Sequence, residues 1–332
     1  MSAMSFTPEV SIDLVAVRRR VAEVAVRTPL VPAPALSEMS GADVWLKLET
    51  VQPTGSFKVR GAASKILAVE RSERSSGVVT ASTGNHGRAV AYVARRLGIP
   101  ATVCISTGVP SGKVAALEAL GASVVVVGET QSEAMERALE IAATDGAVFV
   151  HPFDDLDVIA GQATIGVEIA EDLAGVATVV VPLSGGGLMA GIATASAELT
   201  PHAALVGVSM SRVPIMSMSL ETRRPVEEPE EKTLADSLRG GIGLDNRHTF
   251  RIVSDLVDQV VLVDEDAIWR GMRFMFDEHR LMVEGGGAVG VAALLTGAID
   301  PLASPVVIVI SGANIEPATA AALLTDQPAP TT

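Results

Sequence analysis

From about residue 77 onward, short apolar runs alternate with longer segments whose apolar positions recur every three or four residues. Apolar runs bounded by turn residues predict buried strands, whereas the longer spacing predicts helices. The predicted strands cover residues 77–80, 101–105, 123–127, 147–150, 178–182, 204–208, 259–263 and 306–310. The predicted helices cover residues 88–97, 111–120, 130–143, 159–173, 188–193, 265–279 and 287–295. This alternation predicts an α/β fold with right-handed crossovers and mostly parallel sheets.

The first 76 residues carry a less regular pattern, in which a helix is predicted over 11–26 and a strand over 44–48. A proline and a glycine interrupt the chain after that strand, and Ser56 is expected to cap a helix over 57–71. Lys58 would then lie in the first turn of this helix.

A lysine at that position has unusual chemistry available to it. The helix dipole and any burial both lower the pKa of the Lys58 amine, which leaves more of it uncharged. Uncharged amine is what Schiff-base chemistry needs. The alternative is a solvated lysine on an amphipathic helix, which is the commoner situation for this residue type.

Two loops further along the chain are rich in small residues. Residues 81–87 (Ala-Ser-Thr-Gly-Asn-His-Gly) and 184–187 (Ser-Gly-Gly-Gly) each follow a predicted strand and lead into a predicted helix. Backbone N–H groups exposed at such helix starts bind anions. One amine and two anion sites match what an enzyme needs to hold an aldehyde cofactor, its phosphate and an amino acid carboxylate.

The sequence resembles the fold-type II pyridoxal phosphate enzymes, in the branch of serine and threonine dehydratases and serine racemases. The resemblance rests on ordered motifs: Thr54-Gly55-Ser56-Phe57-Lys58-Val59-Arg60-Gly61-Ala62, Gly84-Asn85-His86-Gly87, Val109-Pro110 with Lys113, His151-Pro152-Phe153, Ala160-Gly161-Gln162-Ala163-Thr164, the 184–187 loop and Ser311-Gly312-Ala313-Asn314. It implies a tryptophan-synthase-β-like fold of two three-layer α/β/α domains with mostly parallel, twisted sheets. Residues 1–76 and 155–332 would form a large cofactor-binding domain, and residues 77–154 a small domain.

The resemblance also implies roles for individual residues. Lys58 would carry pyridoxal 5'-phosphate and later accept the Cα proton of the substrate. The cofactor would be bound by Phe57, Lys58, Asn85, Ser184, Gly185, Gly186, Gly187, Leu188, Glu284 and Ser311. The substrate would be bound by Ser82, Thr83, Gly84, Asn85 and His86. Thr83 is a second catalytic candidate, because the related racemases carry a serine there, and helix capping is the alternative role for Glu284.

Ser311 would face the pyridine nitrogen of the cofactor. A hydroxyl does not hold a proton on that nitrogen as a carboxylate does, so the ring would be a weaker electron sink. Such a ring favours expulsion of a β-leaving group. The predicted reaction is β-elimination on a β-hydroxy amino acid of the threonine or serine type, which gives a 2-oxo acid and ammonia. The alternative for Ser311 is a serine that only ends a strand.

Three other functions stay open. Residues 240–248 resemble the hydroxyectoine-utilisation dehydratases, which are thought to act on a hydroxylated diaminobutyrate derivative, and Arg212 could meet a second substrate charge. The hydroxyl of Thr83 keeps an amino acid racemase as an alternative. Residues 185–190 fit the G-x-G-x-x-A fingerprint, so an NADP-binding oxidoreductase is a further alternative. No metal site is expected, because Ser209 stands where many relatives carry a metal-binding glutamate.

Composition and charge exclude some classes of partner and predict the cellular location. The chain of 332 residues is long enough for about two domains, and its net charge of -14 argues against nucleic acid and acidic membranes as partners. The single Cys104 and the lack of a recognisable targeting segment predict a cytoplasmic protein. The uncharged stretch over 173–197 is interrupted by proline and glycines, so it is expected in the protein interior. The resemblance implies a homodimer that acts on a small amino acid.

Overall fold

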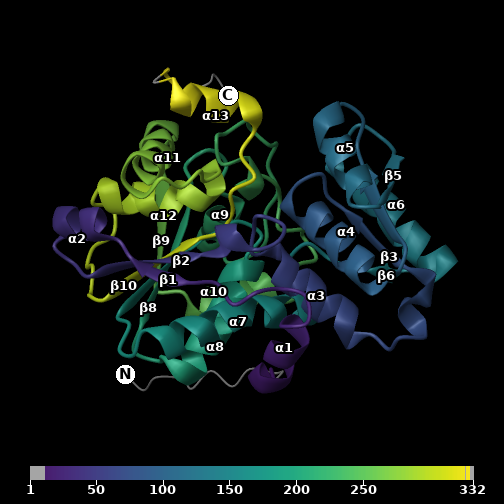
Figure 1. Cartoon of the computed structure of the whole chain (residues 1–332), viewed down its shortest axis with the longest axis horizontal. Coiled ribbons are helices and arrows are strands. Elements are labelled where there is room, and N and C mark those ends of the chain that lie inside the picture. Colours follow the sequence, from purple (N-terminus) through teal and green to yellow (C-terminus); the bar gives the residue numbers. More distant parts are fainter. Residues whose placement is uncertain (1–11, 326, 330–332) are drawn as a thin grey trace.

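Two β-sheets with helices around them form the structure (Figure 1), a computed structural model that describes residues 12–325 and 327–329. Among these residues, one sheet has six strands in the order β1-β2-β10-β7-β8-β9, and the other has four in the order β5-β4-β3-β6. The strands are β1 (Leu30–Pro32), β2 (Val44–Leu48), β3 (Val78–Ala81), β4 (Ala101–Ile105), β5 (Ser123–Val126), β6 (Val148–Phe149), β7 (Thr178–Pro182), β8 (Ala204–Met210), β9 (Gln259–Val263) and β10 (Val306–Ile310). Neighbouring strands are parallel except β1 and β2. The predicted α/β fold with mostly parallel sheets is confirmed.

Helices connect most of these strands. They are α1 (Leu14–Val21), α2 (Pro34–Ser40), α3 (Lys58–Ala68), α4 (Asn85–Leu97), α5 (Ser111–Ala119), α6 (Gln131–Asp145), α7 (Leu156–Asp172), α8 (Gly187–Leu199), α9 (Ile215–Thr222), α10 (Thr249–Leu256), α11 (Glu265–His279), α12 (Gly285–Leu295) and α13 (Pro317–Leu324). Short 3-10 turns cover Glu49–Val51, Glu73–Ser76 and Asp236–Leu238. In the described part of the chain, no helix has both the length and the apolar character needed to cross a bilayer.

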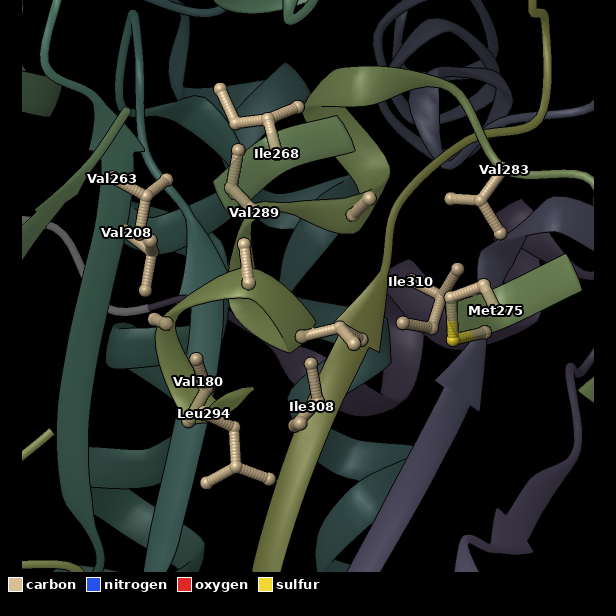
Figure 2. Close-up of a cluster of buried hydrophobic side chains, with 14 of the residues drawn as sticks. Val180, Val208, Val263, Ile268, Met275, Val283, Val289, Leu294, Ile308 and Ile310 are labelled. Atoms are coloured by element: carbon tan, nitrogen blue, oxygen red, sulfur yellow. The ribbon is translucent and has the colours of Figure 1, made fainter. Parts of the chain in front are cut away.

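Helices cover both faces of the six-stranded sheet (Figure 1). Side chains of α2, α11 and α12 form an apolar cluster with one face, and Figure 2 shows Ile308 and Ile310 of β10 in this cluster. Val307 and Val309 of the same strand point to the opposite face, where α7, α8 and α10 pack. A strand buried on both faces has apolar residues at every position, which is why the run 306–310 predicts β10 so clearly.

The four-stranded sheet carries α4 on one face and α6 on the other. The cluster on the α4 face also contains side chains from α1, α3 and α7. Because α7 also packs against the six-stranded sheet, this helix connects the apolar cores of the two sheets.

A buried network of charges lies behind α3. The Arg60 guanidinium, which is 1% exposed, donates to both oxygens of Glu49 at 2.8 Å and to Glu168 at 2.7 and 2.9 Å. Lys47 is also fully buried and lies 2.7 Å from Glu168. Charges removed from water need close partners and hydrogen bonds, and these residues supply them to one another. The network links β2, α3 and α7.

The sequence pattern does not predict five short elements, namely β1, α2, α9, α10 and α13. Each has eight residues or fewer, which leaves little room for a recognisable period. The predicted helix over 11–26 ends early, because α1 stops at Val21, and residue 11 lies outside the described residues. The predicted helix over 88–97 begins earlier, because α4 starts at Asn85.

Candidate active site

The turn that carries Lys58 is paired with the end of β10. Ser56 forms an isolated β-bridge with Gly312, and the Phe57 N–H donates to the Ser311 carbonyl at 3.0 Å. The expected cap by Ser56 is wrong: Phe57 occupies the cap position of α3 without a side-chain hydrogen bond, and Ser56 is fully buried in the bridge. Contacts with the neighbouring strand, and not a local cap, therefore fix the position of Lys58 as the first residue of α3.

The Lys58 amine lies in a mostly enclosed position. Its Nζ donates to the Pro152 carbonyl at 2.7 Å and lies 5.2 Å from the centre of the Phe57 ring. Burial lowers the pKa of Lys58 to about 8, and the Glu284 carboxylate partly offsets this effect. An appreciable fraction of the amine is therefore uncharged near neutral pH.

The loop of residues 82–84 joins β3 to α4, and Asn85 is the first helical residue. A Cβ on Gly87 would lie 2.1 Å from the Ser82 carbonyl oxygen, so the first turn of α4 packs directly on the loop. A side chain at position 87 would push the helix start away from this loop. Ser82 and Thr83 therefore lie next to the N–H groups that open α4, which have no acceptor within the helix.

The His86 side chain has a partner of its own. Its buried ring places Nε2 2.9 Å from the Val150 carbonyl, and because a carbonyl only accepts, this nitrogen donates. Burial lowers the pKa of His86 to about 3, and the positive charge of Lys58 adds to the effect. The ring is neutral and directed to the segment after β6, so His86 can serve a substrate carboxylate through its backbone N–H.

The glycine loop of residues 184–187 turns β7 into α8. The Ser184 hydroxyl donates to the Leu238 carbonyl at 2.8 Å, and Gly186 has φ +86°, a conformation that favours glycine. A Cβ on Gly185 would lie 2.5 Å from the Phe153 ring. The absence of side chains leaves the N–H groups at the start of α8 uncovered, which is the arrangement of an anion site.

The segment after β6 connects the amine to the glycine loop. The Pro152 carbonyl accepts from Lys58, and the neighbouring Phe153 packs against Gly185. Asp154 then accepts hydrogen bonds from three successive N–H groups, those of residues 247–249 at the start of α10, at 2.7 to 2.9 Å. Residues 152–154 thus bring Lys58, the glycine loop and α10 together.

Glu284 lies next to Gly312, the residue that pairs with the turn carrying Lys58. It is 4% exposed, and its Oε1 accepts from Asn85 Nδ2 at 2.7 Å. Burial raises the pKa of Glu284 to about 7, repulsion from Asp236 adds to the rise, and hydrogen bonds, including the one from Asn85, oppose it. Glu284 precedes α12 without capping it through its side chain, so the capping role is wrong.

Asn314 belongs to this site, although the sequence pattern predicts no role for it. Its backbone N–H donates to Glu284 Oε2 at 3.0 Å, and its side chain donates to Asn85 Oδ1 at 2.6 Å. Its place in the Ser311–Asn314 motif is the signal that could have identified it. Ser311 itself is buried at the end of β10, beside the turn that holds Lys58.

Two further residues that the sequence singles out, Ser209 and Arg212, lie in β8 and just after it. Ser209 is buried in β8, and Arg212 donates to the Lys232 carbonyl at 2.7 Å and lies 3.9 Å from Glu265. Within residues 12–325 and 327–329, no cluster of three or more His, Cys, Asp or Glu side chains is arranged to hold a metal ion.

The family of the chain follows from sequence comparison. A sequence profile of the family "Pyridoxal-phosphate dependent enzyme" matches residues 21–312. The chain belongs to the pyridoxal-phosphate-dependent enzymes. It is 47% identical to the putative threonine dehydratase of Sinorhizobium fredii over 90% of each chain. It is 42% identical to the L-threonine ammonia-lyase of Thermotoga maritima over 92% of this chain and 75% of that one. Maize serine racemase superposes with a TM-score of 0.89 at 31% identity, covering 96% of this chain and 97% of the racemase.

The site fits the cofactor of the pyridoxal-phosphate-dependent enzymes. The cofactor needs a lysine that can lose its proton and a phosphate site free of side chains, and both are found next to residues 152 and 153. Phe57 and Asn85 adjoin the same turn. Lys58 and the glycine loop are therefore the groups that would hold pyridoxal phosphate.

The glycine loop gives a first prediction. We expect Gly185→Ala to weaken pyridoxal phosphate binding at least about tenfold, because the new methyl group meets the Phe153 ring at 2.5 Å and displaces the loop. Titration of cofactor-free protein, followed by absorbance, measures the dissociation constant. Gly112→Ala in α5 is the matched control, since a Cβ there meets nothing within 4 Å. Equal affinities of the two variants would contradict the assignment of the loop.

Proposed function

We propose that this protein is a pyridoxal-phosphate-dependent ammonia-lyase that acts on threonine or serine and releases a 2-oxo acid and ammonia. The observation that carries this proposal is the Lys58 amine, held at 2.7 Å from the Pro152 carbonyl beside the glycine loop. Two relatives, a putative threonine dehydratase at 47% identity and an L-threonine ammonia-lyase at 42%, support this substrate class.

In this proposal, the binding roles follow the position of each group. The N–H groups of residues 185–188 hold the cofactor phosphate, aided by the dipole of α8. Phe57, Asn85, Glu284 and Ser311 surround the cofactor ring.

The substrate carboxylate is bound by the loop of residues 82–86. Its N–H groups at the start of α4 attract a negative charge. The His86 ring is directed to Val150, so this residue contributes its backbone. The hydroxyls of Ser82 and Thr83 complete the carboxylate site.

Lys58 moves the proton in the reaction. Bound pyridoxal phosphate supplies an electron-withdrawing ring that makes the Cα proton of the substrate acidic. Lys58 Nζ accepts this proton, and its pKa of about 8 suits a base that works near neutral pH. The bond from Cβ to the hydroxyl oxygen then breaks, and the hydroxyl leaves as water with the proton that Lys58 took up, which restores the amine. Water hydrolyses the released enamine to the 2-oxo acid and ammonia.

A substrate panel tests the proposal. Purified protein loaded with pyridoxal phosphate is incubated with L-threonine, L-serine, hydroxyaspartate and a hydroxylated diaminobutyrate. We expect L-threonine or L-serine to give the fastest release of 2-oxo acid, with an equal amount of ammonia. If none of the four compounds gave a 2-oxo acid, the proposal would be wrong. Fastest turnover of the diaminobutyrate would favour the hydroxyectoine-utilisation branch.

The same incubations test the racemase alternative, which Thr83 motivates. Chiral chromatography of the remaining amino acid is expected to find only the L form. Accumulation of D-serine faster than 2-oxo acid would favour a racemase.

We further propose a cytoplasmic homodimer with a large domain (1–76 and 155–332) and a small domain (77–154). The four-stranded sheet supports the division, since its strands all come from residues 78–149. The buried free thiol of Cys104 suits a reducing compartment. Light scattering on the purified protein tests the assembly and is expected to give twice the mass of one chain.

A further inference from the structure

Asn85, Glu284 and Asn314 form a closed ring of hydrogen bonds beside the Lys58 turn. Asn314 Nδ2 donates to Asn85 Oδ1 at 2.6 Å, and Asn85 Nδ2 donates to Glu284 Oε1 at 2.7 Å. Glu284 Oε2 accepts from the Asn314 backbone N–H at 3.0 Å, which closes the ring. The Asn314 side chain also donates to the Thr54 carbonyl at 2.9 Å. The ring therefore joins α4, the start of α12, the chain after β10 and the turn before Lys58.

The ring allows only one orientation of each side-chain amide. A backbone carbonyl accepts and does not donate, so the Asn314 atom that faces Thr54 is the nitrogen. The same nitrogen faces the Asn85 amide, so the Asn85 atom there is the oxygen. The Asn85 nitrogen must then point to Glu284. The Thr54 carbonyl thus sets the direction of the whole chain of donors and acceptors.

One N–H donor of the two side-chain amides is left for a ligand. A side-chain amide has two N–H donors. Asn314 gives both of its donors to Thr54 and Asn85, whereas Asn85 gives only one to Glu284. The second N–H of Asn85 is the donor that these contacts leave over.

Two glycines make room for the ring. A Cβ on Gly55 would lie 2.9 Å from Asn314 Oδ1, and a Cβ on Gly312 would lie 2.7 Å from Glu284 Oε1. Contacts this short leave no space for a side chain at either position. The two polar groups are therefore packed against backbone, which restricts their rotation.

We propose that Asn314 is a positioning residue that fixes the Asn85 amide with its remaining N–H as a donor to the ring oxygen of pyridoxal phosphate. The proposal rests on the proposed function. A donor stabilises this oxygen as an anion, whereas an amide oxygen in the same place would favour the protonated form. Without Asn314, the Asn85 amide keeps only its contact with Glu284, and where that carboxyl is protonated the amide can turn over and present either group. Asn314 thereby controls the charge state of the cofactor without touching it.

The absorbance of the bound cofactor tests the proposal in the absence of substrate. The deprotonated ring oxygen gives a visible band and the protonated one a near-ultraviolet band. Asn314→Leu keeps the approximate shape of the side chain and removes its donors. We expect it to shift intensity toward the near-ultraviolet band and to weaken cofactor binding about tenfold. A purely space-filling role for Asn314 predicts the wild-type spectrum, and that result would overturn the proposal.

A second variant and a control complete the experiment. Asn314→Asp, measured above pH 8, puts an acceptor opposite the Thr54 carbonyl, and we expect the same spectral shift. This variant replaces Asn314→Leu if the leucine variant fails to fold. Thr54→Val keeps the carbonyl and is expected to keep the wild-type spectrum. Thermal melting of each cofactor-free variant reports on folding. If the wild-type protein itself gave no cofactor band, the proposed function would fail, whereas a normal band in both Asn314 variants would refute only the positioning role.

Discussion

Replacing Lys58 by alanine is expected to lower 2-oxo acid formation from L-threonine or L-serine by at least about 1,000-fold. General-base catalysis alone typically contributes 100- to 10,000-fold, and Lys58 is also the residue proposed to carry the cofactor. The amine belongs to the first residue of α3 and is held by the Pro152 carbonyl at 2.7 Å. Loss of the visible cofactor band and of product formation would be measured on the same sample.

Lys65→Ala is the matched control for this experiment. Lys65 lies on the same helix, and its amine is 2.6 Å from Asp155 and 3.4 Å from Asp157. Its removal deletes a lysine side chain from the same helix but away from the Lys58 turn, so most of the activity should remain. Turnover by Lys58→Ala at a rate near that of Lys65→Ala would rule out Lys58 as the reactive amine.

The second large effect concerns stability. We expect Arg60→Met to lower the free energy of unfolding by about 3–5 kcal/mol, because Glu49 and Glu168 would remain buried without their main cationic partner. Denaturant titration of the cofactor-free protein measures this loss. Neutralising both acids as well, with Glu49→Gln and Glu168→Gln, is expected to restore part of it.

Arg137→Met provides the comparison. Arg137 pairs with Glu140 on the solvent side of α6, where the two side chains are 39% and 60% exposed. Exposed ion pairs contribute little, so the free energy of unfolding should stay nearly unchanged. An Arg60→Met variant as stable as Arg137→Met would show that the buried network does not stabilise the fold.

Elements whose signals are local could be predicted from sequence. The predicted helix over 130–143 corresponds to α6, where Thr130 and Glu133 bond to each other's backbone at the start of the helix. The glycine loop is also recognisable, because strand, small residues and helix follow one another within a few positions. In both cases the determining residues are neighbours in the chain.

Features that depend on distant partners could not be predicted. Ser56 has the residue type of a helix cap, yet its pairing with Gly312 takes precedence. The surroundings of Glu284 are supplied by Asn85 and Asn314, one of which lies 199 residues away in the sequence. No stretch of sequence around position 284 shows that its carboxyl will be buried with a raised pKa.

Asp154 makes the formation of α10 dependent on a distant part of the chain. This helix has eight residues, too few to persist alone in water, and its own cap residue gives no side-chain hydrogen bond. Its first N–H groups are instead accepted by a carboxylate from 93 to 95 residues earlier in the sequence. The stability of α10 therefore depends on the docking of the segment between β6 and α7. Because Thr249 of α10 packs against Gly186, the side chain that backs the glycine loop depends for its position on the same distant carboxylate.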